Sequence, residues 1–254
     1  MPLGIAVKQN LYSVKMPTYK AVMATRPTST SSGARASAAR RKTAPKRPGP
    51  RKMRAAKAEA ASPYHHGALR DALLKAAETV LERDGLQGLT LRAVARQAGV
   101  SHAAPTHHFG DLTGLISELA AIGFRSFNAA MAAAPREAGA AAYVRFAQAH
   151  PGLYGLMFRT ERLDMTRPAL HDAANASFAG LAGAIGARRH EHISEDALTL
   201  EQGAAIARAW SLVHGFTVLL LDGRLADVLR RMPEGTDVET LLGAMLTARL
   251  DPVS

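Results

Sequence analysis

Apolar residues recur at helical spacing along most of the chain from about Tyr64 onward. In LRDALLKAAETVLERDG (69–85), charged residues occupy the other faces of a helix whose one apolar face consists of Leu69, Leu73, Ala76, Val80 and Leu81. Gly85 is expected to end this helix. Alanine is frequent and aromatic residues are only 5% of the chain, which favours closely packed helices over sheets. The pattern predicts an all-α protein.

The next segment predicts two short helices joined by a tight turn. Thr90 is placed as the N-cap of LRAVARQAG, and Gly99 supplies the left-handed residue that a sharp exit requires. Ser101 is expected to cap the following helix, with Pro105 at its fourth position. Two helices separated by such a turn form a helix-turn-helix, which presents the start of its second helix to the DNA major groove.

Further helices are expected along the rest of the chain. Asp111 opens a fourth helix that continues to about Met131. Later apolar stripes predict helices over 140–150, 152–158, 168–189, 204–221 and 238–250.

The segment 204–221 is apolar nearly all round, interrupted by Arg208 and His214. It is too polar and slightly too short for a membrane span. A helix of this kind needs burial on every side, and 238–250 adds a second apolar stripe. We therefore expect these two helices to pair with their copies in a four-helix homodimer interface.

Large apolar side chains gather between the predicted helices of the second half. Each can be ordinary core, but their concentration is also the usual setting of a cavity for a small apolar ligand. His214 is either a hydrogen-bonded core histidine or a ligand contact. The candidate effector-binding residues are Phe124, Phe127, Tyr143, Phe146, Met157, Phe158, Phe178, Trp210 and His214.

The net charge of +11 is unevenly distributed. Residues 1–63 hold fourteen of the 32 Lys and Arg and one acid, Glu59, whereas the remaining residues carry a net charge of −2. We expect 1–63 to be a disordered basic tail that binds polyanions without reading sequence. Alternatives are a transit peptide or an over-long gene prediction; a secretory signal lacks its apolar stretch.

The histidines do not have the spacing of a metal site. His107 and His108 are adjacent and point about 100° apart on a helix, so they cannot share a metal. No nucleophile–base pair stands out, and with no cysteine a disulfide or thiolate site is impossible. We expect no cofactor, no metal and no enzymatic activity, in a cytoplasmic protein.

Residues 66–125, and TLRAVARQAGVSHAAPTHHFGDLTGL within them, resemble the tetracycline-repressor (TetR) family of transcriptional regulators. WSLVHGF (210–216) is similar to the Trp-x-x-x-His-Gly signature of one ligand-domain subgroup. The resemblance implies a helix-turn-helix DNA-binding domain at 64–110 and a helical ligand-binding and dimerisation domain at 111–254. It also implies a palindromic double-stranded DNA operator as partner.

The resemblance places DNA contacts around the turn and on the recognition helix. Thr90 and Ser101 would contact phosphates, and His108 would face a phosphate or pack beside Phe109. The positions that would meet base edges are His102, Ala103, Thr106 and His107. The implied function is a ligand-responsive dimeric regulator, expected to be a repressor. Two alternatives remain: an architectural DNA-binding protein driven by the basic tail, and a small-molecule-binding protein or enzyme with a vestigial helix-turn-helix.

Overall fold

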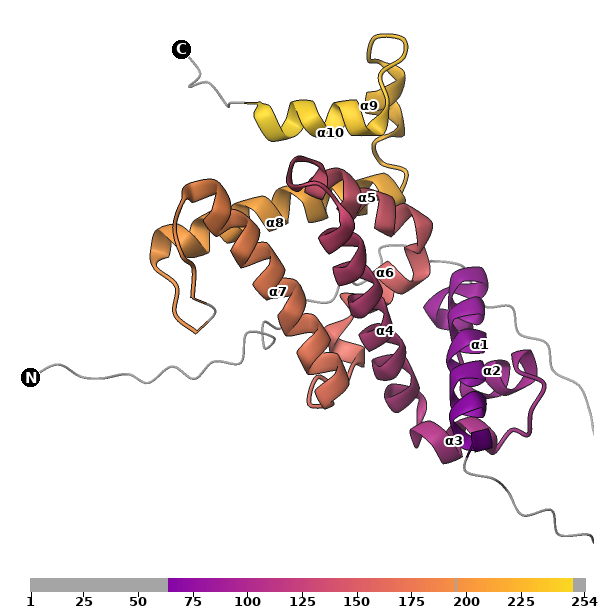
Figure 1. Ribbon diagram of the computed structural model, residues 1–254. Helices are drawn as coiled ribbons and strands as arrows, with labels where there is room; N and C mark the ends of the chain where they lie inside the picture. The colour runs from indigo at the N-terminus through magenta and orange to yellow at the C-terminus, as the bar shows by residue number, and fades with distance from the viewer. Residues whose placement is uncertain (1–63, 195, 249–254) are drawn as a thin grey trace, which may run out of the picture. The chain divides into compact units, whose positions relative to one another are not determined.

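The structure, a computed structural model, describes residues 64–194 and 196–248, and every regular element within them is a helix (Figure 1). These described residues belong to one compact unit. The basic tail predicted over 1–63 lies outside the described residues. The elements are α1 (Tyr64–Gly88), α2 (Leu91–Gln97), α3 (Ala104–Phe109), α4 (Leu112–Ala133), η1 (Arg136–Ala138), α5 (Gly139–Ala149), α6 (Pro151–Met157), η2 (Thr160–Arg162), α7 (Pro168–Arg189), α8 (Leu200–Leu221), α9 (Ala226–Arg230) and α10 (Val238–Thr247).

Helices α1, α2 and α3 pack together with the start of α4, and we call residues 64–110 the head (Figure 1). The apolar stripe of α1 is buried as its spacing predicts: Leu73 and Val80 are fully buried, and so is Val94 of α2. Gly85 adopts a positive φ of 67° and breaks the helical geometry of α1. The small three-helix head therefore has a core of its own.

Helix α4 connects the head to the remaining helices, which we call the body. Asp111 caps its start by accepting a 2.7 Å hydrogen bond from the Gly114 amide. Along its length α4 packs against α7, α6 and α5, so one helix contacts both the head and the body (Figure 1). At Gly123 a Cβ would lie 2.9 Å from the Met157 side chain, so glycine there lets α4 and α6 approach closely.

Two clusters of buried apolar residues hold α8 in the body. Val144, Phe216 and Leu242 join α5, α8 and α10. A second cluster joins α7 and α8 through Ala182, Ile193 and Ile206, with Phe178 against it. Helix α8 begins at a capping box in which Thr199 and Gln202 satisfy each other's backbone amides. The predicted all-α fold, with a helix-turn-helix head followed by a helical body, is confirmed.

Candidate DNA interface and effector site

The turn between α2 and α3 has the geometry that the sequence predicts. The Thr90 hydroxyl accepts a 3.1 Å hydrogen bond from the Ala93 amide, and so caps α2. Gly99 has a φ of 69°, and the Val100 amide donates to the Ala95 carbonyl at 3.0 Å. This left-handed glycine closure directs the chain sharply away from α2 and into α3.

The predicted cap at Ser101 is wrong, because α3 begins three residues later at Ala104. The Ser101 carbonyl accepts a 3.0 Å hydrogen bond from the Ala104 amide, so residues 101–104 form a turn ahead of the helix. Pro105 is therefore among the first two helical residues instead of the fourth. A proline there removes no helical hydrogen bond, since the first amides of a helix lack internal partners anyway.

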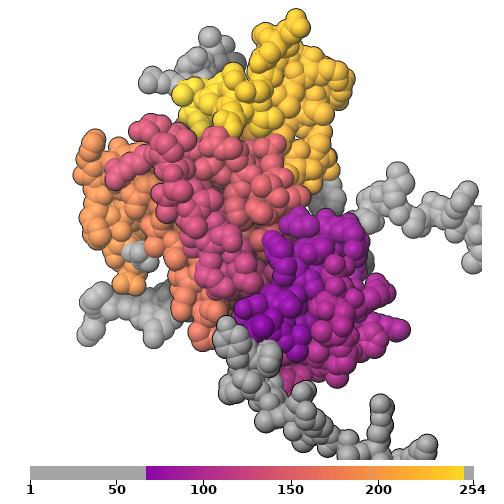
Figure 2. Space-filling model, turned by 45° about the vertical axis from the view of Figure 1, so that its right-hand side comes forward, coloured from indigo at the N-terminus to yellow at the C-terminus, as the bar shows by residue number. Residues whose placement is uncertain are grey.

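The later start divides the predicted DNA-contacting residues between the turn and the helix. Ser101, His102 and Ala103 lie in the exposed turn, and Thr106 and His107 are exposed on α3. His108 is half-buried, with its ring 6.2 Å from that of Phe109. Figure 2 shows the side chains of the head, coloured indigo to magenta, gathered on one part of the surface. An exposed turn and short helix of this kind can enter a major groove.

Phe109 fastens α3 to the other head helices. Its side chain is only 4% exposed, and the Arg70 guanidinium of α1 lies 5.6 Å from the centre of its ring. Gly110 follows with a φ of 81° and ends the helix. The orientation of α3 thus depends on one buried aromatic ring and a cation held beside it.

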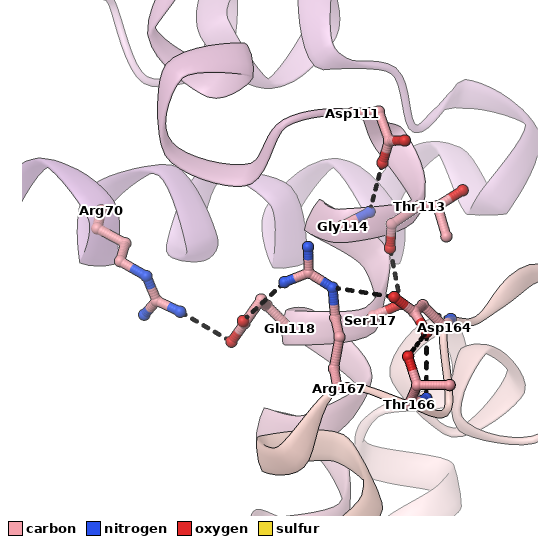
Figure 3. A network of polar contacts seen from close by, with 9 residues as sticks. All are labelled: Arg70, Asp111, Thr113, Gly114, Ser117, Glu118, Asp164, Thr166 and Arg167. Atoms are coloured by element: carbon pink, nitrogen blue, oxygen red, sulfur yellow. Dashed lines mark hydrogen bonds and ion pairs between the residues drawn. The ribbon is translucent and has the colours of Figure 1, made fainter.

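Arg70 also belongs to a polar network that links the head to the body (Figure 3). The Glu118 carboxylate of α4 accepts from Arg70 Nη2 at 2.8 Å and from Arg167 Nη1 at 3.2 Å. Arg167 is the residue before α7, and Asp164 lies three residues earlier. The Asp164 amide donates to the hydroxyl of the fully buried Ser117 at 2.9 Å. Sequence reasoning missed this network.

A second polar link joins α1 to α6. The Glu82 carboxylate accepts from the Gly152 and Leu153 amides, both at 2.8 Å. The first amides of a helix have no hydrogen-bond partner within the helix itself, and the helix dipole favours a negative charge beside them. Glu82 therefore caps a body helix from the head.

The body holds an aromatic cluster around α8, formed by residues of α4, α5, α6 and α8. The ring of Phe127 lies 5.1 Å from Tyr143 and 5.3 Å from Phe146, and Phe124 lies 6.1 Å from Phe158. Phe158 in turn contacts His214 at 4.6 Å. Most of the predicted effector residues are thus brought together. Met157 is buried against α4, whereas Phe178 belongs to the separate cluster between α7 and α8.

Three hydrogen-bonding groups meet inside this cluster, and we call them the polar trio. His214 Nδ1 lies 2.9 Å from the Tyr143 hydroxyl and 2.8 Å from the Tyr154 hydroxyl, which are 3.2 Å apart. The sequence singled out Tyr143 and His214 but did not predict their contact. Trp210 lies at the edge, 6.3 Å from the His214 ring and 44% exposed. Trp210 and His214, four positions apart on α8, thus lie on one face of the helix.

The polar trio is uncharged at neutral pH. Burial raises the pKa of Tyr154 to about 12, and burial raises the pKa of Tyr143 further still. Burial also lowers the pKa of His214 below its ordinary 6.5, because the charged imidazolium is the form that desolvation penalises. The trio can exchange hydrogen bonds but offers no charge to a bound molecule.

The lowered pKa of His214 predicts a loss of stability in mild acid. In the unfolded chain His214 binds a proton more readily, so its contribution is complete above pH 6.5 and is lost as the pH falls. We expect the melting temperature to decrease from pH 7.5 to about pH 5.5. This decrease in melting temperature should be smaller in His214→Gln than in the wild type. It should equal that of the wild type in His171→Gln, which alters an exposed histidine of α7. Equal decreases in both variants would contradict the assignment.

Two surface hollows lie away from the aromatic cluster. One is beside α1 and α4, and the other, of about 360 Å³, lies between the end of α1 and α6 and includes Arg159 and Arg162. None of the predicted effector residues lines either of them. Within the described residues, no group of three or more His, Cys, Asp and Glu is arranged to hold a metal ion.

These features define a helix-turn-helix DNA-binding head joined to a helical body. The family model described as "Bacterial regulatory proteins, tetR family" matches residues 73–119. The model described as "Tetracyclin repressor-like, C-terminal domain" matches residues 137–248. No curated protein matches the chain.

Two solved structures are similar over most of the chain. A protein with unknown function from Rhodococcus sp. RHA1 is 34% identical, covers 72% of this chain and 94% of its own, and has a TM-score of 0.55. The putative regulatory protein SCO4313 is 22% identical, covers 74% of this chain and 97% of its own, and has a TM-score of 0.53, a likeness in fold alone. The chain belongs to the TetR family. It is a DNA-binding transcriptional regulator, and members of this family are not enzymes.

Proposed function

We propose that the protein is a homodimeric repressor that binds a palindromic operator in the cytoplasm and releases it when a small apolar effector binds. The observation that carries the dimer is the exposed apolar surface of α8. Only 17% of its most apolar stretch is buried within the protomer, and Trp210, Val218 and Leu219 are between 38% and 44% exposed. An exposed apolar surface of this kind is typical of a protein–protein interface.

A membrane is the other environment that could cover α8. The prediction that this segment is too polar and slightly too short for a membrane span is wrong, because α8 extends over the 22 residues Leu200–Leu221 and is long and apolar enough to cross one. One helix of this composition is weak evidence, and two features favour a second copy instead. Helix α8 is joined to α5, α7 and α10 by buried clusters, and it bears Arg208 and His214, the one member of the polar trio on this helix. A second copy would cover the apolar residues and leave the charged ones at its edge.

For operator binding, we propose that the exposed turn and α3 read the major groove. His102, Thr106 and His107 would reach base edges, and Ala103 would contact apolar base atoms. Thr90 and Ser101 flank the turn, where hydroxyls and backbone amides suit phosphate oxygens. His108 is half-buried beside Phe109 and would contribute through the placement of α3 or a phosphate contact.

The operator can be obtained by selecting bound duplexes from a random library with the purified protein. We expect His102→Ala and Thr106→Ala to relax preference at particular base positions, by roughly 1–3 kcal/mol for each good base interaction that the substitution removes. His171→Ala, an exposed histidine of α7, should leave the profile unchanged. If both head variants bound the sequence variants in the same order of affinity as the wild type, these two residues would not contribute to sequence recognition. Failure to select any site would contradict specific DNA binding.

For the effector, we propose the aromatic cluster as the binding site, with the polar trio as its polar contact. The rings of Phe124, Phe127 and Phe158 suit a small apolar molecule, and the uncharged trio suits one neutral hydrogen-bonding group. The proposed site also includes Tyr143, Phe146, Met157, Trp210 and His214. It leaves out Phe178, which the sequence also predicts but which packs in the separate cluster between α7 and α8. The rings are packed against one another, so binding would require α4, α6 and α8 to separate.

The charge of residues 1–63 supports a second DNA-binding contribution, in which these residues contact phosphates without reading sequence. We expect deletion of 1–63 to preserve the dimer and its sequence preference. The slope of log affinity against log salt concentration should become shallower, by about 0.9 for each phosphate that these residues neutralise. Titrations of the selected operator at several salt concentrations measure this slope. An unchanged slope would show that 1–63 does not touch DNA. Loss of all sequence preference would instead favour an architectural DNA-binding protein.

A further inference from the structure

The Glu118 network contains one residue whose partners are incomplete. Arg167 donates from Nη1 to Glu118 at 3.2 Å, which is long for a charged pair. Its Nε atom is buried without a hydrogen-bond partner among the described residues, and it lies 3.7 Å from Oδ2 of Asp164. Figure 3 shows the Arg167 side chain between these two acids. Its Nη1 thus faces Glu118 and its Nε faces Asp164, and neither contact has the length of about 2.7–2.9 Å that a strong charged hydrogen bond has.

The two acids are held by different parts of the molecule. Glu118 is fixed on α4 and keeps the 2.8 Å ion pair with Arg70 of the head. Asp164 lies in residues 158–167, which we call the α6–α7 connection, and its amide is tied to Ser117 of α4. Because the Asp164 backbone is anchored there, its carboxylate can meet Arg167 after a small side-chain movement.

Gly114 leaves room for this exchange on the side of α4. A Cβ built there would lie 2.8 Å from Arg167 Nη2 and 2.0 Å from the Phe109 carbonyl oxygen. The guanidinium therefore reaches to the point where α3 ends and α4 begins. Movement of Arg167 would alter the contact between the head and the connection directly.

The connection begins at the proposed effector site. Phe158, its first residue, has its ring 4.6 Å from His214, and Arg167 is its last residue. A molecule that displaced Phe158 from His214 would shift one end of a ten-residue segment that carries both Asp164 and Arg167. The network is thus placed between the aromatic cluster and the head.

We propose that Arg167 is the movable member of an ion-pair switch, which ties α7 to the head when paired with Glu118 and frees it when paired with Asp164. This inference rests on the proposed ligand response and names its coupling residues. With Arg167 on Glu118, the carboxylate joins Arg70 of α1 to the start of α7. With Arg167 on Asp164, Glu118 retains Arg70 alone and the head is no longer linked to α7 by charge.

The switch makes an unusual prediction about neutralising the two acids. Glu118→Gln favours the Asp164 partner and should loosen the head, whereas Asp164→Asn removes that partner and should hold Arg167 on Glu118. Asparagine retains the side-chain oxygen that accepts from Thr166 in the present structure. If the network only supported the fold, both variants would act in the same direction.

The test measures distances within one protomer by pulsed electron spin resonance. The chain has no cysteine, so Arg92→Cys on α2 and Ala176→Cys on α7, neither of them buried, give unique labels. Labelled protein is diluted with excess unlabelled protein to isolate pairs within a protomer. We expect Glu118→Gln to broaden the distribution and add a second distance. Asp164→Asn should give a distribution at least as narrow as that of the parent. Arg162→Gln, an exposed arginine of the same connection, is the matched control and should change nothing.

Affinity for the selected operator gives an independent measurement on unlabelled variants. We expect Glu118→Gln and Asp164→Asn to change affinity in opposite directions, with a total spread of at least about fivefold. Should Glu118→Gln fail to fold, Glu118→Asp shortens the same side chain and replaces it. Distance changes in the same direction for both acids, or none for Glu118→Gln, would overturn the switch. The distance measurement contains no DNA, so failure to select an operator would overturn the proposed function without deciding this result.

Discussion

Leu219→Arg is expected to convert the dimer into monomers and to reduce operator affinity by at least about two orders of magnitude. Leu219 lies on α8 and is 42% exposed in the protomer, so an arginine there meets water and the fold should survive. In the proposed interface the same side chain meets a second copy, where an unpaired buried charge costs several kcal/mol and each protomer contributes one. Sedimentation and operator titration measure the two effects.

The matched control is Asp172→Arg, which places the same charge on an exposed position of α7. It should remain dimeric and bind operator as the wild type does. Circular dichroism of Leu219→Arg should show unchanged helix content. A stable Leu219→Arg dimer with normal operator affinity would remove this part of α8 from the interface.

The sequence predicts the helices well because their signals are local. Thr90 precedes α2, Gly99 takes the left-handed conformation, and Asp111 caps α4 by accepting from the Gly114 amide. Each of these depends on residues within four positions along the chain. The error at Ser101 was local too, because a serine before a helix favours a cap but the turn ahead of Pro105 delays the helix to Ala104.

The polar links between head and body could not be predicted from the sequence. Glu118 is 48 residues from Arg70 and 49 from Arg167, and Glu82 is 70 from Gly152. A charged residue on an amphipathic helix looks solvated unless the facing helix is known. The polar trio has the same character, since His214 meets residues 60 and 71 positions away. The aromatic residues were identifiable by type, but the exclusion of Phe178 required the packing of α7 against α8.

Phe109 is the buried residue by which α3 packs into the core of the head. Its ring is 4% exposed, and it receives the Arg70 guanidinium that also pairs with Glu118. The buried ring therefore holds α3 in place, and the ion pair with Glu118 holds Arg70 beside the ring. Removal of the ring would leave a cavity between α3 and the other head helices, and Arg70 would lose its aromatic partner.

Phe109→Ala is expected to lower the free energy of unfolding by about 3–5 kcal/mol, a large part of the stability of an ordinary domain. Amide exchange should rise first in α1, α2 and α3, where the core is weakened, while the clusters around α8 stay protected. Denaturant unfolding with amide exchange measures both, and specific operator binding should fall with the folded fraction of the head. Leu200→Ala, at a position 84% exposed, should change stability by less than about 0.5 kcal/mol. Equal increases of exchange in the head and the body would show that the head does not unfold separately, and that Phe109 supports the whole fold.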